Sequence, residues 1–151
     1  YFLLTIFVLL NLDIYLAWPP KKIISEDTAN LNNRLTAIDT VYNDSQGRGF
    51  KIYNFAPYVY DYPYQYLIWW TAKTKYGYLP EQYSYLDNQP TYVNDKIEAD
   101  KKIPSRKSEC RYLIMEPFEN QEKLFILWRG LFPDAVNTWK IGKTTVDKIC
   151  P

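Results

Sequence analysis

The chain has 151 residues, of which 47% are hydrophobic and 23% are charged, and its formal net charge is +1. This composition is typical of one folded domain, and the near-neutral charge excludes the strongly basic surface that nucleic-acid-binding proteins use. The sequence contains no histidine, the commonest general base and neutral metal ligand. It also has no glycine-rich motif for a phosphate or a dinucleotide. We therefore expect no nucleic-acid partner, no metal site and no cofactor.

Residues 1–18, YFLLTIFVLLNLDIYLAW, begin with ten residues among which Thr5 is the only polar side chain. As a helix this segment would span about 27 Å, close to the roughly 30 Å hydrocarbon core of a bilayer. It ends in Trp-Pro-Pro-Lys-Lys, which suits the membrane interface. A signal peptide would need a basic start and a small-residue cleavage site, and neither is visible in this segment. A buried core helix remains an alternative, because Asp13 is costly in lipid. We expect a membrane-anchoring helix over 1–18 and an extracytoplasmic domain over 19–151.

The first element of that domain is predicted to be a helix over residues 25–42. Ser25 or Asp27 can cap its first turn. Its apolar side chains recur at helical spacing, through Leu31, Leu35, Ile38 and Tyr42. A turn-rich loop over 43–49 follows.

A strand and a second helix come next. Residues 50–56 alternate in the manner of a strand, with one face formed by Phe50, Ile52 and Asn54. Two prolines bracket a loop over 57–63. Residues 64–75 are then predicted to form a helix, which Gly77 ends.

The C-terminal half continues the alternation of strands and helices. Residues 81–108 are polar and irregular, so we expect a surface loop there. Residues 110–116, CRYLIME, form an apolar run typical of a buried strand. Residues 120–130 predict a helix, and we expect its inward side chains to be Leu124, Leu127 and Trp128. Residues 138–149 are β-rich, and Gly142 indicates a bulge or a turn between two short strands.

This order of helices and strands predicts the α/β class. We expect one small domain with a short mixed or parallel sheet flanked by helices, preceded by the N-terminal hydrophobic helix.

Two cysteines, Cys110 and Cys150, lie 40 positions apart and lack the close spacing of a metal site. They are either two separate buried thiols or a disulfide that ties the chain end to the strand at 110–116. If the domain lies outside the cytoplasm, the disulfide is favoured. A disulfide would make the C-terminal strand a neighbour of that strand.

Residues 50–80 contain twelve aromatic side chains. Such a cluster is either the core of the domain or a surface that stacks on a sugar or a lipid headgroup. If the segment is extended, the tyrosines at every second position from 58 to 66 share one face. The candidate carbohydrate-binding residues are Tyr58, Tyr60, Asp61, Tyr62, Tyr64, Trp69, Trp70 and Tyr76.

The same block carries a familiar pattern of residues. Its members here are Phe55, Pro57, Tyr60, Asp61, Tyr62, Tyr64, Tyr66, Leu67, Trp70, Lys75, Tyr76, Gly77, Tyr78 and Pro80. The pattern resembles the soluble domain that follows the last membrane helix in some bacterial polytopic glycosyltransferases. These belong to the dolichyl-phosphate-mannose protein mannosyltransferase and aminoarabinose transferase superfamily. The resemblance covers the chain from residue 17 to its end.

The resemblance implies an extracytoplasmic accessory domain of a membrane glycosyltransferase that uses a lipid-linked sugar donor. In that superfamily the catalytic acidic residues lie on the first extracytoplasmic loop, and no position of this chain matches that loop. The resemblance therefore implies a chain that is not catalytic by itself. Its expected partners are membrane lipid and a polyprenyl-phosphate sugar or glycan, and its expected location is the cell membrane.

Other functions stay open on the residues alone. A pilin-like filament or envelope subunit would self-assemble through the N-terminal helix, and the start at Tyr1 without methionine suits a fragment or processed product. Such subunits usually carry Glu at the fifth mature position, where this chain has Thr5.

A free-standing sugar-binding module is a third hypothesis. A glycoside hydrolase would need Asp61 to share a pocket with Glu81 or Glu116, and the sequence does not fix that spacing.

Overall fold

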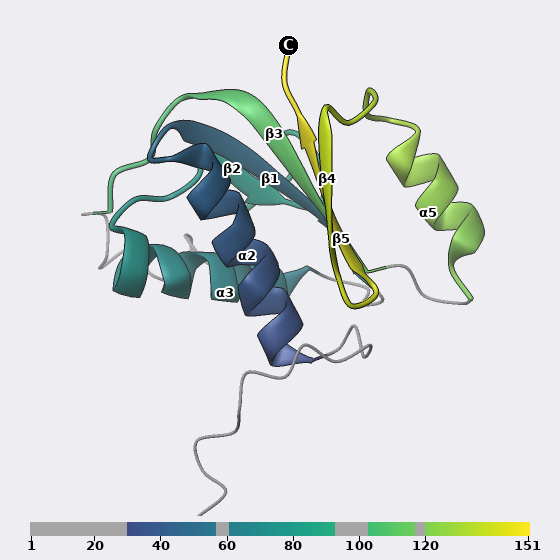
Figure 1. The fold of residues 1–151 in the computed structure, drawn as a ribbon, viewed down its shortest axis with the longest axis horizontal. Coiled ribbons are helices and arrows are strands. Elements are labelled where there is room, and N and C mark those ends of the chain that lie inside the picture. Colours follow the sequence, from purple (N-terminus) through teal and green to yellow (C-terminus); the bar gives the residue numbers. More distant parts are fainter. Residues whose placement is uncertain (1–29, 57–60, 93–102, 117–119) are drawn as a thin grey trace, which may run out of the picture.

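A computed structural model describes residues 30–56, 61–92, 103–116 and 120–151 (Figure 1). These residues form a five-stranded sheet with the strand order β2-β1-β3-β5-β4. The predicted α/β domain with a mixed sheet flanked by helices is thereby confirmed. The anchoring helix expected over residues 1–18 lies outside the described residues. Among the described helices, none has both the length and the apolar composition needed to cross a bilayer.

The sheet has a parallel half and an antiparallel half. Its strands are β1 (Gly49–Phe55), β2 (Gln82–Ser84), β3 (Ser108–Met115), β4 (Asn137–Ile141) and β5 (Thr144–Ile149). β1 pairs in parallel with β2 and with β3, whereas β5 pairs antiparallel with β3 and with β4. The helices are α2 (Leu31–Ser45), α3 (Tyr62–Thr71) followed by the π-helical turn η1 (Ala72–Tyr76), and α5 (Glu122–Arg129).

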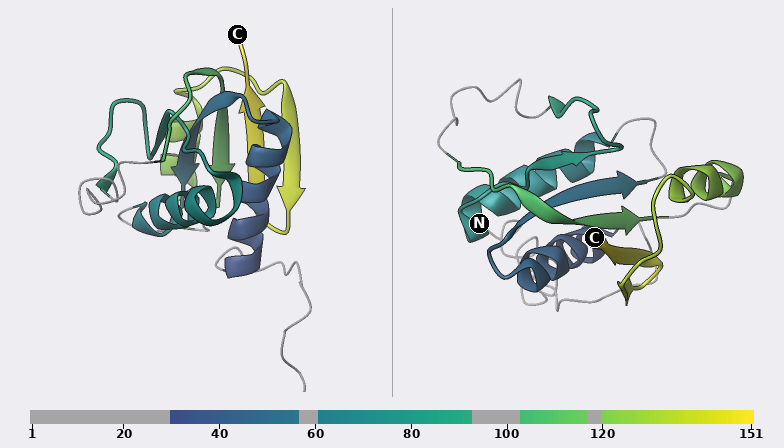
Figure 2. Two further views of the ribbon diagram at one scale, coloured as in Figure 1. Left: turned by 90° about the vertical axis from the view of Figure 1, so that its left-hand side faces the viewer. Right: turned by 90° about the horizontal axis from the view of Figure 1, so that it is seen from above.

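Helices cover both faces of the sheet, α2 and α3 on one face and α5 on the other (Figures 1 and 2). Because successive side chains of β1 point to opposite faces of the sheet, this strand contributes side chains to both cores. Phe50 and Ile52 face the core under α2 and α3, whereas Tyr53 and Phe55 face the core that Trp128 of α5 completes. A strand covered on both faces has apolar side chains on both, which explains the apolar run by which the strand at 110–116 was predicted.

Helix α2 begins later than the sequence suggested. Its N-cap is Asn30, whose Oδ1 accepts a hydrogen bond of 2.8 Å from the backbone N–H of Asn32, so neither Ser25 nor Asp27 caps it. The face packed on the sheet includes Ala37, Ile38, Val41 and Tyr42. Leu31, which we expected on that face, is 56% exposed.

Helix α3 begins earlier than predicted, at Tyr62. Pro63 falls in its first turn, where a missing N–H breaks no helical hydrogen bond. The helix passes into η1, and Gly77 adopts φ 75° at its end as predicted. The condition under which the tyrosines from 58 to 66 would share one face, an extended segment, is therefore not met from Tyr62 onward, because these residues are helical.

The region predicted as a surface loop contains β2, whose three residues pair with β1 from Lys51↔Gln82 to Tyr53↔Ser84. A three-residue strand carries too little periodicity to be recognised in a sequence. At the other edge of the sheet, Gly142 has φ 60° between β4 and β5. Gly142 therefore belongs to a two-residue hairpin turn, one of the two alternatives that the sequence left open.

Helix α5 was predicted, but its orientation was not. Trp128 is buried as expected, and Phe125 and Phe132 pack beside it. Leu124 and Leu127, which we expected to point inward, are 58% and 69% exposed. The aromatic side chains occupy the inward positions because they pack on the rings of the sheet, with Phe125 and Trp128 both centred within about 5.5 Å of Phe55.

Cys110 and Cys150 form a disulfide, with their Cα atoms 4.4 Å apart. The bridge joins the beginning of β3 to the residue that follows β5, and these two strands pair from Arg111↔Ile149 onward. Both the predicted disulfide and the predicted neighbouring strands are confirmed. The bridge fixes the last residues of the chain, which would otherwise fray.

The disulfide closes a loop with a sequence separation of 40, and loop-closure entropy of that size predicts a stabilisation of about 3–4 kcal/mol. Reducing the bridge, or the substitution Cys150→Ser, should lower the free energy of unfolding by this amount. Urea denaturation with and without reductant measures it. An unchanged midpoint would show that the bridge contributes nothing to stability.

Stability should also depend on Asp44 at acid pH. Burial opposes ionisation of Asp44, but hydrogen bonds from Lys148 and Tyr112 outweigh it and lower the pKa of the carboxyl group. A carboxyl group with a lowered pKa in the folded state stabilises the fold above its unfolded pKa, and the contribution is lost as pH falls through the folded pKa. As the pH falls below about 4, the melting temperature of the Asp44→Asn variant should therefore fall less steeply than that of the original chain. Parallel pH curves would contradict this prediction.

Candidate functional site

Helix α3 divides the aromatic block into a buried and an exposed side. Tyr64 and Ile68 are at most 1% exposed and belong to the core. Tyr62, Tyr66 and Trp70 are 41%, 52% and 42% exposed. Their spacing of four residues places these three rings along one side of the helix. We call this set the aromatic row, and it means that the block is neither wholly core nor wholly surface.

Neighbouring rings support two members of the aromatic row, Tyr62 and Tyr66. The ring of Tyr62 meets that of Tyr92 edge to face at a centroid distance of 4.9 Å. The ring of Tyr66 lies 5.9 Å from that of Trp69, and the Lys73 ammonium lies 5.1 Å over the Trp69 ring. Rings supported in this way lose little freedom on binding, so they suit a flat apolar ligand face bordered by polar atoms.

Asp61 stands at the first turn of α3, at one end of the aromatic row. Its Oδ1 accepts a hydrogen bond of 2.8 Å from Gln65 Nε2, and its Oδ2 accepts a longer one of 3.4 Å from Asn54 Nδ2. Gln65 is fully buried, and its Oε1 accepts from the backbone N–H of Tyr92. The partly exposed carboxylate is thus oriented by buried amides and can accept further hydrogen bonds from a ligand.

Asp61 lies beyond the carboxyl end of β1, beside the last residue of β2. Asn54, near the end of β1, contacts both Asp61 and the backbone carbonyl of Ser84. The Asn54 Oδ1 atom is buried and has no hydrogen-bond partner among the described residues. In open α/β sheets, ligands bind outside the carboxyl ends of parallel strands. The position of Asp61 therefore agrees with the general location of ligand sites in this class of fold.

A buried ionic cluster lies at the carboxyl end of β3. Arg34 Nε and Nη2 each donate a hydrogen bond of 3.0 Å to the Glu116 carboxylate, and the Tyr64 hydroxyl donates one of 2.7 Å. Burial first, and then the Glu116 charge, raise the pKa of Tyr64 well above its usual value, so the phenol stays protonated. The candidate residue Tyr64 thus connects α3 to β3 and α2, and its ring faces the core.

The remaining candidate residues lie apart from the aromatic row or outside the described residues. The Tyr76 ring stacks on that of Tyr42 at 4.2 Å, and its hydroxyl donates to Asp39 Oδ1, so Tyr76 joins η1 to α2. Tyr58 and Tyr60 lie outside the described residues. Asp61, Tyr62, Trp69 and Trp70 come together on or beside the exposed side of α3. Tyr66 was missing from the candidates, although helical spacing from Tyr62 would have identified it.

No pair of the suggested carboxylates shares a pocket. Glu116 is fully buried against Arg34. The Glu81 carboxylate accepts hydrogen bonds from the backbone and side chain of Ser108 at the beginning of β3. Asp61, in contrast, follows the carboxyl end of β1. Because β1 and β3 are parallel, Asp61 and Glu81 lie at opposite ends of these strands. The geometry that glycoside hydrolysis requires is therefore not formed by these three residues.

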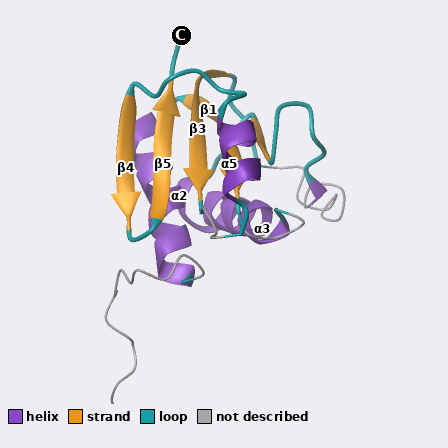
Figure 3. Ribbon diagram, turned by 90° about the vertical axis from the view of Figure 1, so that its right-hand side faces the viewer, coloured by secondary structure: helices purple, strands orange, loops and turns teal. Residues whose placement is uncertain are grey.

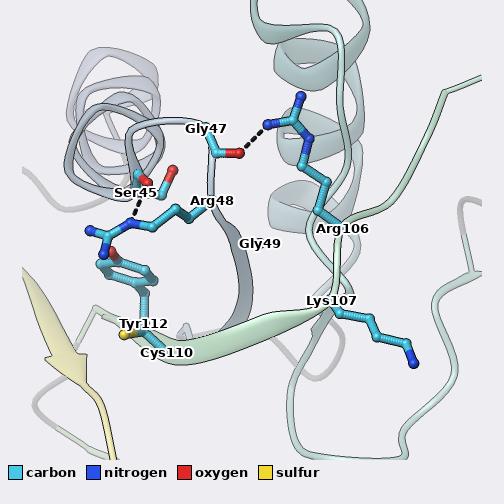
Figure 4. Close-up of a pocket in the computed structure, with 8 residues that line it drawn as sticks. All are labelled: Ser45, Gly47, Arg48, Gly49, Arg106, Lys107, Cys110 and Tyr112. Carbon is cyan, nitrogen blue, oxygen red and sulfur yellow. Dashed lines mark hydrogen bonds between the residues drawn. The ribbon is translucent and has the colours of Figure 1, made fainter.

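A basic cavity of about 280 Å³ lies at the amino ends of β1 and β3 (Figure 4). Arg48 Nε donates to the backbone carbonyl of Ser45, and Arg106 Nη1 donates to that of Gly47. Figure 4 shows these two guanidinium groups on opposite sides of the intervening backbone, with Lys107 pointing away. The charges do not converge on one point, so the arginines fasten the loop rather than form an anion site.

Among the described residues, no group of three or more acidic or cysteine side chains could hold a metal ion. Comparisons with protein families, with curated proteins and with solved structures found no match to this chain. Its function must therefore be inferred from the geometry of α3 and its surroundings.

The buried cluster leads to a stability prediction. Glu116→Gln removes the countercharge that the Arg34 guanidinium has in the core, and breaking a buried ion pair in this way costs about 3–5 kcal/mol. The double substitution Arg34→Met with Glu116→Gln removes both charges and keeps an amide acceptor for the Tyr64 hydroxyl, so it should cost clearly less. Chemical denaturation of the single and double variants measures the difference. A double variant as unstable as Glu116→Gln would contradict the ionic account.

Proposed function

We propose that this chain is an extracytoplasmic accessory domain of a membrane glycosyltransferase that uses a lipid-linked sugar donor. In this proposal the aromatic row on α3 contacts the sugar of a glycan or of the polyprenyl-phosphate donor. The domain binds and orients that sugar, and the catalytic residues belong to other parts of the enzyme.

The observation that carries the proposal is the exposure of three aromatic rings, Tyr62, Tyr66 and Trp70, on one side of α3. A sugar ring presents an apolar C–H face that can lie against such rings, while its hydroxyl groups need acceptors at the edge. Tyr and Trp supply both a flat apolar body and a polar atom. Asp61 adds an oriented carboxylate at one end of the row. The combination of stacking surface and acceptor supports sugar binding over contact with a purely apolar ligand.

The position of α3 relative to the start of the described chain supports a role close to a membrane. Arg34 in α2 and Tyr64 in α3 both bind Glu116, so the first turns of the two helices lie together, at the lower side of the domain in Figure 1. If residues 1–18 lie in a bilayer, the connection 19–29 reaches at most about 36–40 Å. Within that distance, α3 can approach the headgroup of a lipid-linked sugar.

The Cys110–Cys150 disulfide supports an extracytoplasmic location, because disulfides persist mainly in oxidising compartments. The filament-subunit alternative rests on residues 1–18 and gains no support from the described residues.

Binding of a short-chain polyprenyl-phosphate sugar to the full chain in lipid nanodiscs tests the proposal. Tyr66→Ala and Trp70→Ala should each weaken binding roughly three- to tenfold, because each removes a stacking ring. The matched control is Tyr85→Ala. Tyr85 is 39% exposed, and its ring packs against Phe55 and Trp128 on the opposite face of the sheet.

The control variant should bind like the original chain. Thermal melts must first show that all three variants remain folded. Equal affinity of the original chain and both α3 variants, or equal weakening in all three variants, would overturn the proposed contact surface.

A further inference from the structure

The outer side of α5 carries a second apolar surface. Leu124, Leu127 and Leu131 are 58%, 69% and 65% exposed. Leu131 follows the helix, and its backbone N–H donates a hydrogen bond to the Trp128 carbonyl. The three leucines therefore continue at the helical spacing i, i+3 and i+7. They form a stripe on one side of the helix, which we call the leucine stripe. Figure 3 views the sheet face that α5 crosses.

The leucine stripe cannot turn inward, because the neighbouring side of α5 is fixed against the sheet. Trp128 is 2% exposed, and its Nε1 donates a hydrogen bond of 3.0 Å to the Tyr85 carbonyl. Arg129 forms an ion pair of 3.1 Å with Asp147 of β5 and donates to the carbonyl of Phe132. A rotation of α5 that buried the leucines would expose the indole ring and break these bonds. The exposure of the stripe is therefore a property of the packed domain.

We infer that the leucine stripe is the interface between two copies of this chain, with their α5 helices antiparallel across a two-fold axis. Leu127 occupies the middle of the stripe, with one leucine three residues before it and one four residues after it. A rotation by 180° about Leu127 therefore places Leu124 of one copy against Leu131 of the other. A surface that matches itself under this rotation is what a two-fold dimer requires.

The shape of the stripe favours a second helix over a bilayer. A stripe one leucine wide at i, i+3 and i+7 corresponds to the narrow seam of a coiled coil. A helix that lies in a membrane surface has a broader apolar face and a polar face rich in Lys and Arg. α5 has two basic residues, Lys123 and Arg129, and one acidic residue, Glu122. Because Arg129 is bound to Asp147, little cationic attraction to lipid remains on the helix.

The exposed area is of the size that a dimer needs at its centre. The three leucines of the stripe, at 58%, 69% and 65% exposure, present apolar area on the order of 400 Å², within the range of the largest patch on a typical monomer. A standard interface buries roughly 800 Å² on each partner, with a polar rim around an apolar centre. The stripe supplies that centre. Since α5 and α3 lie on opposite faces of the sheet, dimerisation leaves the aromatic row accessible and does not depend on the proposed sugar contact.

Sedimentation equilibrium of the full chain in detergent micelles, at several ratios of protein to detergent, tests the inference. The original chain should dimerise. Leu124→Glu alone and Leu131→Lys alone should each weaken dimerisation at least tenfold, because each buries a charge against a leucine. The double variant Leu124→Glu with Leu131→Lys should return to within about threefold of the original affinity, because the antiparallel arrangement places the new carboxylate against the new ammonium group.

The matched control is Ile126→Glu, which introduces the same charge on α5 away from the leucine stripe and should leave dimerisation unchanged. Four results would overturn the inference: a monomer at every concentration, association that none of the stripe variants weakens, a double variant no better than the single variants, and equal weakening by Ile126→Glu. The first or second result would indicate a bilayer or an unrelated partner on this surface, and the third would show that the two α5 helices do not pair antiparallel. Far-ultraviolet circular dichroism and an intact disulfide establish that each variant is folded.

Discussion

The buried contact of Glu116 with Arg34 and Tyr64 determines how the parts of this domain are arranged. One carboxylate at the end of β3 receives hydrogen bonds from α2 and from α3, so it fixes both helices on the same sheet face. A fully buried carboxylate needs such partners, because an unpaired charge in a core is very costly. With Tyr64 fixed inward, helical geometry leaves the side chains at positions 62, 66 and 70 on the outside. The exposed aromatic row thus follows from a buried ionic contact.

The two faces of the sheet have different coverings, and this difference separates the two surfaces of interest. On one face, α2 and α3 bury an aliphatic and aromatic core, and α3 directs rings to the solvent. On the other face, α5 contributes rings to the core and directs leucines to the solvent. Amphipathic rings at an exposed surface suit a polar ligand with a flat apolar side, whereas aliphatic side chains suit a dry protein interface.

Much of the fold could be predicted from the sequence, because the side chains of β1 alternate, β3 contains an apolar run and Gly77 marks a helix end. The disulfide was predictable once an oxidising location was assumed. The orientation of α5 was not, since its leucines and its aromatic residues both recur at helical spacing, and only the rings of the sheet decide which set is buried. Tyr66 was missed because residues 57–63 were predicted as a loop and the helix as beginning at residue 64, which concealed the helical spacing of four between Tyr62 and Tyr66.

The central claim is that the exposed side of α3 contacts a sugar. The indole N–H signals of Trp70 and Trp128, followed by nuclear magnetic resonance during titration of the full chain in nanodiscs with a polyprenyl-phosphate sugar, test it most directly. The two indoles lie on opposite faces of the sheet and serve as an internal control, with Trp128 Nε1 bound to the Tyr85 carbonyl. The account predicts that the Trp70 signal shifts with ligand while the Trp128 signal stays in place. Ligand binding that leaves the Trp70 signal unchanged, or that shifts only the Trp128 signal, would contradict it.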